Sequence, residues 1–531
     1  MANTTNALTD FDICVALAQK AIDSQMEYAW RTWKRRSGFD DKISIFKRTN
    51  DMGELIDSKF GLEATFAPLK ISLAVEGGRQ GQVRVTMPMP EGKVTYFNED
   101  KEGVDYHEFK DWSISFIADL DKKTVDLKAL AALDPDSHKS AEGLINDSGL
   151  PETVFSIEYL FMKLTSVDLL LSDNKDINIP HDVPFDARAR ALQMLNIMLQ
   201  GSMGEYMMGT VVRRKTRQGT PTFALTDFTF SVRANWDAVG ASTLEYLGAL
   251  GGRPMPADLN AARLKLNDHW IGAEHIDGRN SSVSGVMILS REVLVEKYLI
   301  AAFSKALGFT PIREGLKWKY KFDDVRTTSH DDYGPVLVED WKFKVGQQDF
   351  KTVQRYEIEF EIVPDTHLIK FSGATTGSFK YDGYNELVKL ATPEHIEWLY
   401  YTGSQQITGE VKLSTSGIAA DFQIDTDVTY SVGEYNETEN EASALMEVYN
   451  VVSEILKELD LVGDSIKGAM STITQNLATE ITAALKQGLD SVAIELKQQG
   501  YIPPGGGVFS FQNPRFTNAG DLMMDVIYIA P

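Results

Sequence analysis

Residues that could bind a metal or transfer protons are present, but their spacing suits neither task. His269 and His275 flank Trp270 without the spacing of zinc ligands. The acidic groups at 173–182 and 425–427 lack the glycine and terminal glutamate of a calcium-binding loop. The sequence contains no phosphate-binding loop, zinc-protease helix or nucleophile elbow. It therefore predicts no catalytic residue, no metal and no cofactor, and we expect a protein that is not an enzyme.

Two basic clusters stand out against an acidic background. The first is Arg31, Lys34, Arg35 and Arg36, beside Trp30 and Trp33, and the second is Arg213, Arg214, Lys215 and Arg217 at a predicted hairpin tip. Cations beside tryptophans suit an anionic membrane surface, so both clusters are candidates for one. A solvated helix end and a charged turn are the simpler interpretations, and for each cluster alone we prefer them.

Methionines gather between residues 194 and 208. They are Met194, Met198, Met203, Met207 and Met208. The methionine side chain repacks easily around apolar ligands of different shapes, although core packing is its commoner use. Met194, Met198, Met207 and Met208 are therefore candidate walls of a lipid groove.

The longest periodic pattern predicts an amphipathic helix over 441–499. Apolar residues recur from Leu445 to Leu496 at a mean spacing of about 3.64, close to that of a straight α-helix. Such a helix is roughly 75 Å long, so an equally long surface must cover its apolar face. Glycines within the pattern leave a division into collinear helices open. The candidate groove residues on this helix are Leu477, Ile481 and Leu485.

Alternation of apolar and polar residues predicts antiparallel strands elsewhere. The pattern occurs at 69–75 and 83–89 around a glycine-rich turn, and again at 112–116, 155–161, 228–232, 318–322 and 356–362. Shorter helices are predicted over 11–33, from about 186 to 199 and after Ser290. One-sided alternation is typical of antiparallel sheets. The predicted fold class is α+β: an elongated molecule with twisted antiparallel sheets wrapped around the long helix.

The order of these elements predicts two lobes. A chain of 531 residues is long for one domain, and the Gly/Pro-rich segment at 250–256 is a plausible boundary. The first lobe, 1–255, combines helices with antiparallel sheet. The second, 256–531, contains the long helix and closing strands. Each half is predicted to have the element order helix, strands, helix, strands. A duplication that gives two structurally similar halves is therefore one alternative.

Composition narrows the function classes. The net charge is −23 and the pI about 4.8, which argues against nucleic acid as a partner. The single cysteine, Cys14, is predicted to be a small buried hydrophobe. No secretory signal or membrane-spanning segment is visible, so we expect a cytoplasmic product as synthesised, with later release by a non-classical route left open.

A long amphipathic helix wrapped by antiparallel strands resembles the TULIP superfamily of tubular lipid-binding proteins. Within it, the chain most resembles the bacterial branch of clostridial neurotoxin gene clusters, the OrfX proteins and their forty-seven-kilodalton companion. Four segments carry the resemblance: Phe11-Asp12-Ile13, residues 242–247 leading to Pro254, residues 285–303, and the ending from Phe509 through Phe516 to Tyr528. They span nearly the whole chain, and none is a catalytic motif.

The resemblance implies a non-enzymatic protein whose partners are lipid or other toxin-cluster proteins. An open groove would hold lipid; a closed one would leave a toxin accessory that acts by protein–protein association. The alternative is a pore-forming or insecticidal toxin subunit, which would release dye from liposomes. A third hypothesis is an enzyme whose site assembles from distant residues. The lipid and the oligomeric state stay open at this point.

Overall fold

The computed structural model describes most of the chain outside one long segment near the C-terminus. The described residues are 8–36, 41–75, 81–147, 150–164, 177–180, 182–200, 205–215, 224–266, 269–272, 283–301, 304, 309–330, 336–338, 341–343, 348–382, 397–414, 417–432, 500–502 and 508–529. The predicted helix 441–499, with Leu477, Ile481 and Leu485, lies outside them. No helix among the described residues is long and apolar enough to cross a membrane.

The chain forms two compact units that are discontinuous in sequence. Unit 1 comprises Met1–Thr4, Tyr298–Asp490 and Arg515–Gly520, and unit 2 comprises Thr5–Lys297, Ser491–Pro514 and Asp521–Pro531. Strand pairing is antiparallel throughout the described sheets, which confirms the predicted sheet type. The lobe boundary predicted near residue 255 stays a prediction.

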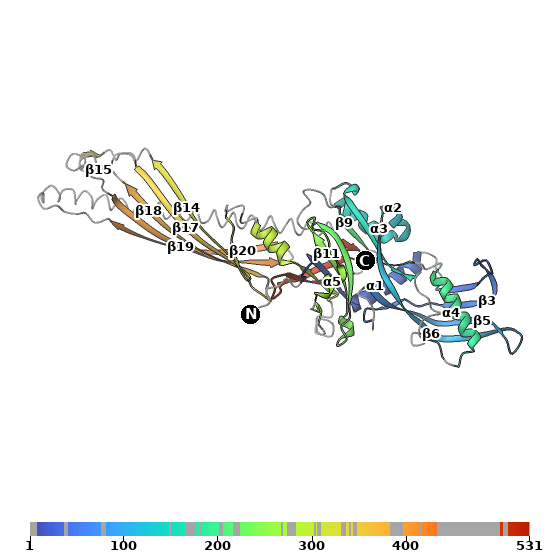
Figure 1. Ribbon diagram of the computed structural model, residues 1–531. Coiled ribbons are helices and arrows are strands. Elements are labelled where there is room, and N and C mark those ends of the chain that lie inside the picture. Colours follow the sequence, from blue (N-terminus) through green and yellow to red (C-terminus); the bar gives the residue numbers. More distant parts are fainter. Residues whose placement is uncertain are drawn as a thin grey trace. The chain divides into compact units, whose positions relative to one another are not determined.

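The largest sheet of unit 2 has nine strands. Its order is β2 (Lys42–Thr49), β3 (Leu55–Thr65), β5 (Gln82–Asn98), β6 (Gly103–Val125), β7 (Phe155–Lys163), β9 (Glu205–Arg214) and β21 (Gly500–Ile502). The short strands β4 (Lys70–Ser72) and β8 (Ile177–Asn178) pair with β5 and β6. Long curved strands β5 and β6 dominate it (Figure 1). Alternation along β5 places Val83, Val85, Met87 and Met89 in the core, as the sequence predicts.

Helices cover both faces of this sheet. Helices α1 (Gln19–Arg36) and α4 (Phe185–Met198) pack on its inner face, and α4 lies against β5, β3 and β2. The paired helices α2 (Leu127–Leu133) and α3 (Pro135–Asp147) cover the outer face of β7 and β9, after a short turn η1 (Glu152–Val154). Strand β7 is therefore buried on both faces, although its sequence alternates.

A second sheet of six strands closes the core of unit 2. Its order is β10 (Leu225–Arg233), β11 (Thr243–Leu250), β1 (Ile13–Ala18), β12 (Gly285–Leu289), β23 (Leu522–Ile529) and β22 (Val508–Phe516). The predicted helix over 11–33 is wrong in its first part, because residues 13–18 pair with both β11 and β12. Around this sheet lie η5 (Val239–Ala241), α5 (Leu259–Leu264) and the π-helix η6 (Glu292–Ile300).

Unit 1 contains a six-stranded sheet. Its order is β13 (Ile312–Glu314), β14 (Lys317–His330), β17 (Gln348–Ile362), β18 (Leu368–Asp382), β19 (Glu397–Ser414) and β20 (Gly417–Val432). A separate pair is formed by β15 (Val336–Val338) and β16 (Trp341–Phe343). Trp318, Tyr320, Ile358 and Phe360 are buried on one face of the sheet, so the predicted strands at 318–322 and 356–362 are confirmed.

Candidate ligand-binding site

The main core of unit 2 is rich in methionine. Among the described residues, eight of the 41 buried side chains in this core are methionines, and none of the eight is more than 3% exposed. They are Met26, Met87, Met89, Met162, Met194, Met198, Met208 and Met287. They come from α1, α4 and both sheets, so the methionines line the interior from several sides. We call this whole core of 41 buried residues the methionine core.

Helix α4 brings two of these methionines onto the nine-stranded sheet. Pro184 precedes the helix, which suits the fixed φ of proline. Buried positions then recur at helical spacing, with Ala187 and Ala191 followed by Met194 and Met198. The small alanines let the first half of α4 approach the strands closely, while the methionines fill the space beneath the second half.

Strand β9 separates the other two predicted methionines. Met208 joins the methionine core, whereas Met207 packs in a different cluster with α2 and α3. A β-bulge occurs here, because Leu160 pairs with Gly209 and Phe161 with Met207. Gly209 has φ +152°, a conformation that side chains disfavour. The structure therefore brings Met194, Met198 and Met208 together but not Met207.

A half-buried arginine lies on one flank of α4. The Arg190 guanidinium carbon is 5.6 Å from the centre of the Phe60 ring on β3. Its Nη1 donates a hydrogen bond of 2.8 Å to Gln193 Oε1. Phe60 in turn contacts Phe97 on β5 edge-on, with 6.1 Å between ring centres. Burial lowers the pKa of Arg190, and no carboxylate of the described part of the chain forms an ion pair with it.

Two members of the second basic cluster, Arg213 and Lys215, donate hydrogen bonds within the protein, and the role of the cluster at an anionic surface stays a prediction. Arg213 forms an ion pair of 2.9 Å with the buried Glu158 and donates to the Thr226 carbonyl at 2.7 Å. Lys215 donates to the Thr153 carbonyl at 3.0 Å. Arg214 ends β9, and Arg217 lies outside the described residues. Arg213 therefore has a structural role that the sequence does not reveal.

The first basic cluster ends helix α1. Arg31 is exposed and pairs with Glu27 at 3.3 Å, one turn earlier. Lys34, Arg35 and Arg36 form the last residues of the helix. Cations in this position interact favourably with the helix dipole, and a role of the cluster at an anionic surface stays a prediction.

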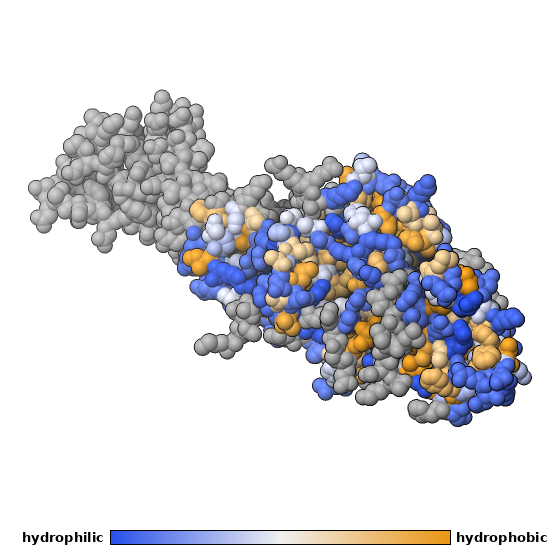
Figure 2. Space-filling model, turned by 45° about the vertical axis from the view of Figure 1, so that its right-hand side comes forward, coloured by the Kyte–Doolittle hydropathy of each residue, from blue (hydrophilic) through white to orange (hydrophobic). Residues whose placement is uncertain are grey.

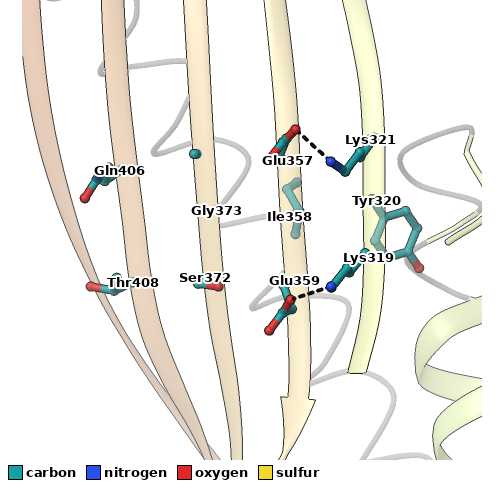
Figure 3. A pocket seen from close by; sticks show the side chains of 11 residues that line it. Lys319, Tyr320, Lys321, Glu357, Ile358, Glu359, Ser372, Gly373, Gln406 and Thr408 are labelled. Carbon is teal, nitrogen blue, oxygen red and sulfur yellow. Dashed lines mark hydrogen bonds and ion pairs between the residues drawn. The ribbon is translucent and has the colours of Figure 1, made fainter. Parts of the chain in front are cut away.

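Unit 1 has a polar pocket on the exposed face of its sheet, with a volume of about 360 Å³. Figure 3 shows side chains from four neighbouring strands around it, among them Lys319, Lys321, Glu357, Glu359, Ser372, Gln406 and Thr408. The charges pair across strands: Lys321 lies 2.9 Å from Glu357, and Lys319 lies 3.7 Å from Glu359. Each of these two carboxylates therefore has a lysine partner on the neighbouring strand.

Buried charges in the six-stranded sheet are also paired. Glu245 is fully buried and accepts a hydrogen bond of 2.8 Å from Arg233. Asp12 lies 2.9 Å from Arg253. Cys14 is fully buried, as predicted, and burial raises the pKa of its thiol well above the usual value. No group of three potential metal ligands occurs among the described residues.

Comparison with known proteins gives structural neighbours without a sequence match. The sequence matches no protein-family model and no curated protein. The structure of P47 from Clostridium botulinum A2 is similar at a TM-score of 0.46 and 11% identity, covering 99% of each chain. A crystal structure of lipopolysaccharide binding protein is similar at a TM-score of 0.25 and 8% identity, covering 98% of this chain and 99% of that one. At such values, function has to be inferred from this chain's own residues.

Proposed function

We propose that this protein binds lipid without catalysis, holding an acyl chain in the methionine core of unit 2 between α4 and the nine-stranded sheet. The observation that carries the proposal is the concentration of methionine there: eight of 41 buried residues. Methionine is unbranched, has three rotatable bonds and changes shape at little cost. Such a lining can close on itself when empty and repack around an inserted chain.

The energetics of such a site are favourable. Each methylene removed from water contributes about 0.8 kcal/mol, so a sixteen-carbon chain contributes roughly 12 kcal/mol before costs. Ordering of the lipid and repacking of the protein offset a large part of that gain. A core of branched side chains would repack at a higher cost, because branched residues have fewer accessible rotamers.

The charged groups of the described residues support the non-enzymatic part of the proposal. The buried acids Glu245 and Asp12 each pair with an arginine, and the polar pocket of unit 1 is internally neutralised. A catalytic acid or base usually lies in a cleft with a perturbed pKa and access to substrate. These pairs instead satisfy buried charges within a sheet.

The test compares lipid-stripped protein with protein refilled with a long-chain phospholipid. Native mass spectrometry should detect bound lipid, and the refilled protein should melt at a higher temperature because the ligand binds only the folded state. Replacing Met194, Met198 and Met208 with leucine conserves volume, so the variant should fold but bind lipid more weakly. Met207→Leu, on the other face of β9, is the matched control and should bind like the wild type.

The proposal fails if no lipid copurifies and none raises the melting temperature. The interior would then be closed, and function would move to association with other proteins, for which the toxin-cluster resemblance of the sequence provides the first candidates. If the leucine variant binds lipid as tightly as the wild type, the protein binds lipid, but at a site outside the methionine core.

A further inference from the structure

The flank of α4 beside the methionine core carries a positive charge, Arg190, that forms no ion pair among the described residues. Arg190 is only partly exposed, and its contacts are the Gln193 amide and the Phe60 ring. Asp186 lies one turn earlier on the same helix, yet among the described residues no carboxylate forms an ion pair with Arg190. A half-buried guanidinium loses hydration, so an anionic partner would stabilise it.

The surroundings of Arg190 include both exposed and buried side chains. Phe60 contacts Phe97, which is 46% exposed, so one side of the arginine faces an accessible aromatic surface. Figure 2 shows apolar patches between polar ones at the end of unit 2 where α4, β3 and β5 lie in Figure 1. In the other direction, Met194 follows Arg190 by four residues, a rise of about 6 Å along the helix.

An apolar seam continues along the same flank. Ile197 follows Arg190 by seven residues, which places both on one side of α4. It is partly buried and packs against the methionine core, as do Ile43 and Ile45 on the edge strand β2, against which α4 also lies. The charged Arg190, the partly buried Ile197 and the buried Met194 and Met198 thus all lie within about two turns of α4.

We propose that Arg190 binds the anionic head of an amphiphile, a phosphate or carboxylate, while the acyl chain runs along α4 into the methionine core. This inference rests on the proposed function. The planar guanidinium can donate two parallel hydrogen bonds to either oxyanion, which a lysine cannot do. Stacking on Phe60 and the bond to Gln193 hold it in place, so little side-chain entropy is lost on binding.

The signature of this site in the sequence is faint. Phe60 and Arg190 are 130 positions apart, and their contact depends on α4 folding over β3. Arg188, two residues earlier, lies on the other flank of the helix, where Leu192 also packs. The chain therefore offers a control arginine on the same helix with the same charge and a different environment.

The experiment measures binding of lysophosphatidic acid, oleate, neutral monoolein and inorganic phosphate to the full-length, lipid-stripped protein by calorimetry. Arg190→Gln should weaken lysophosphatidic acid and oleate roughly tenfold to a hundredfold, the range expected for a lost charge-assisted pair. Monoolein should bind the variant and the wild type alike. Arg190→Lys should recover part of the affinity, and Arg188→Gln should change nothing.

The outcomes separate this inference from the proposed function. If the wild type binds monoolein and the acids, but Arg190→Gln binds the acids unchanged, the head site is wrong and the lipid-binding function stands. If the wild type binds no amphiphile at all, both are wrong. If inorganic phosphate binds at Arg190 as tightly as lysophosphatidic acid does, the ligand of Arg190 is free phosphate, and the proposal of a lipid head group there is wrong. The ligand-free Arg190→Gln variant should melt close to the wild type, because the lower cost of burying a neutral side chain offsets the lost contacts with Gln193 and Phe60.

Discussion

Removal of Arg233 should destabilise unit 2, because the buried carboxylate of Glu245 would lose its cationic partner. Glu245 is fully buried in the six-stranded sheet, and the Arg233 side chain, 16% exposed, lies 2.8 Å from it. Arg233→Met keeps much of the side-chain volume but leaves an unpaired buried carboxylate. Breaking a buried pair from one side costs about 3–5 kcal/mol, and we expect a loss of that size at pH 7.

The loss should depend on pH. Burial raises the pKa of Glu245 above its usual value, while Arg233 lowers it. Without Arg233 the pKa rises further, so the folded state binds the proton more tightly than the unfolded chain. An acid with a raised pKa weakens the folded state as pH rises through that pKa. The variant should therefore approach wild-type stability at about pH 4 and below, where Glu245 is largely protonated in both the folded and the unfolded state.

Urea unfolding followed by circular dichroism at both pH values measures this difference. The double variant Arg233→Met, Glu245→Met removes both charges and should be closer to the wild type than the single variant is. A loss below about 1 kcal/mol at pH 7, or an equal loss at both pH values, would refute the reasoning, because either result means that Glu245 does not carry a buried charge.

Three further predictions concern packing and charge in unit 2. Gly61→Ala should lower the free energy of unfolding by about 1–3 kcal/mol, because the new Cβ would lie 2.2 Å from the Ile45 carbonyl oxygen. Gly143→Ala in α3 is the contrasting variant: its Cβ meets nothing within 4 Å, so the same urea assay should show a gain of up to about 1 kcal/mol. Arg213→Ala should lower stability by about 1–3 kcal/mol yet leave sedimentation with anionic liposomes unchanged, because Arg213 is bound to Glu158; reduced sedimentation would return it to the membrane hypothesis. Cys14 should react with a thiol reagent only at the rate of unfolding, and rapid labelling of native protein would contradict its burial.

The sheets could be predicted from the sequence because alternation is a local signal. Met87 and Met89 point into the core as their period of two requires. The segment Ile13–Ala18 was predicted as helix because its apolar residues continue the spacing of α1; pairing with β11 and β12, more than 200 residues away, makes it a central strand. Local periodicity cannot report such long-range pairing.

In the candidate site, too, local spacing could be predicted from the sequence and long-range packing could not. Met194 and Met198 could be predicted together because they are one helical turn apart, and both lie in the core. Met207 was expected in the same groove, but the bulge at Gly209 places it against the cluster of α2 and α3, and sequence spacing does not reveal that bulge. The sequence gives little sign of Arg190, because its environment depends on Phe60 and on the lack of an ion-pair partner among the described residues, both of which are tertiary properties.

The most direct test of an acyl chain in the methionine core is photo-crosslinking with a phospholipid that carries a diazirine at the end of one chain. The account predicts labelled peptides from α4 and from β5, around Met194, Met198 and Met87, and competition by unlabelled lipid. Labelling confined to exposed surface residues, or no labelling at lipid concentrations that saturate binding, would contradict it.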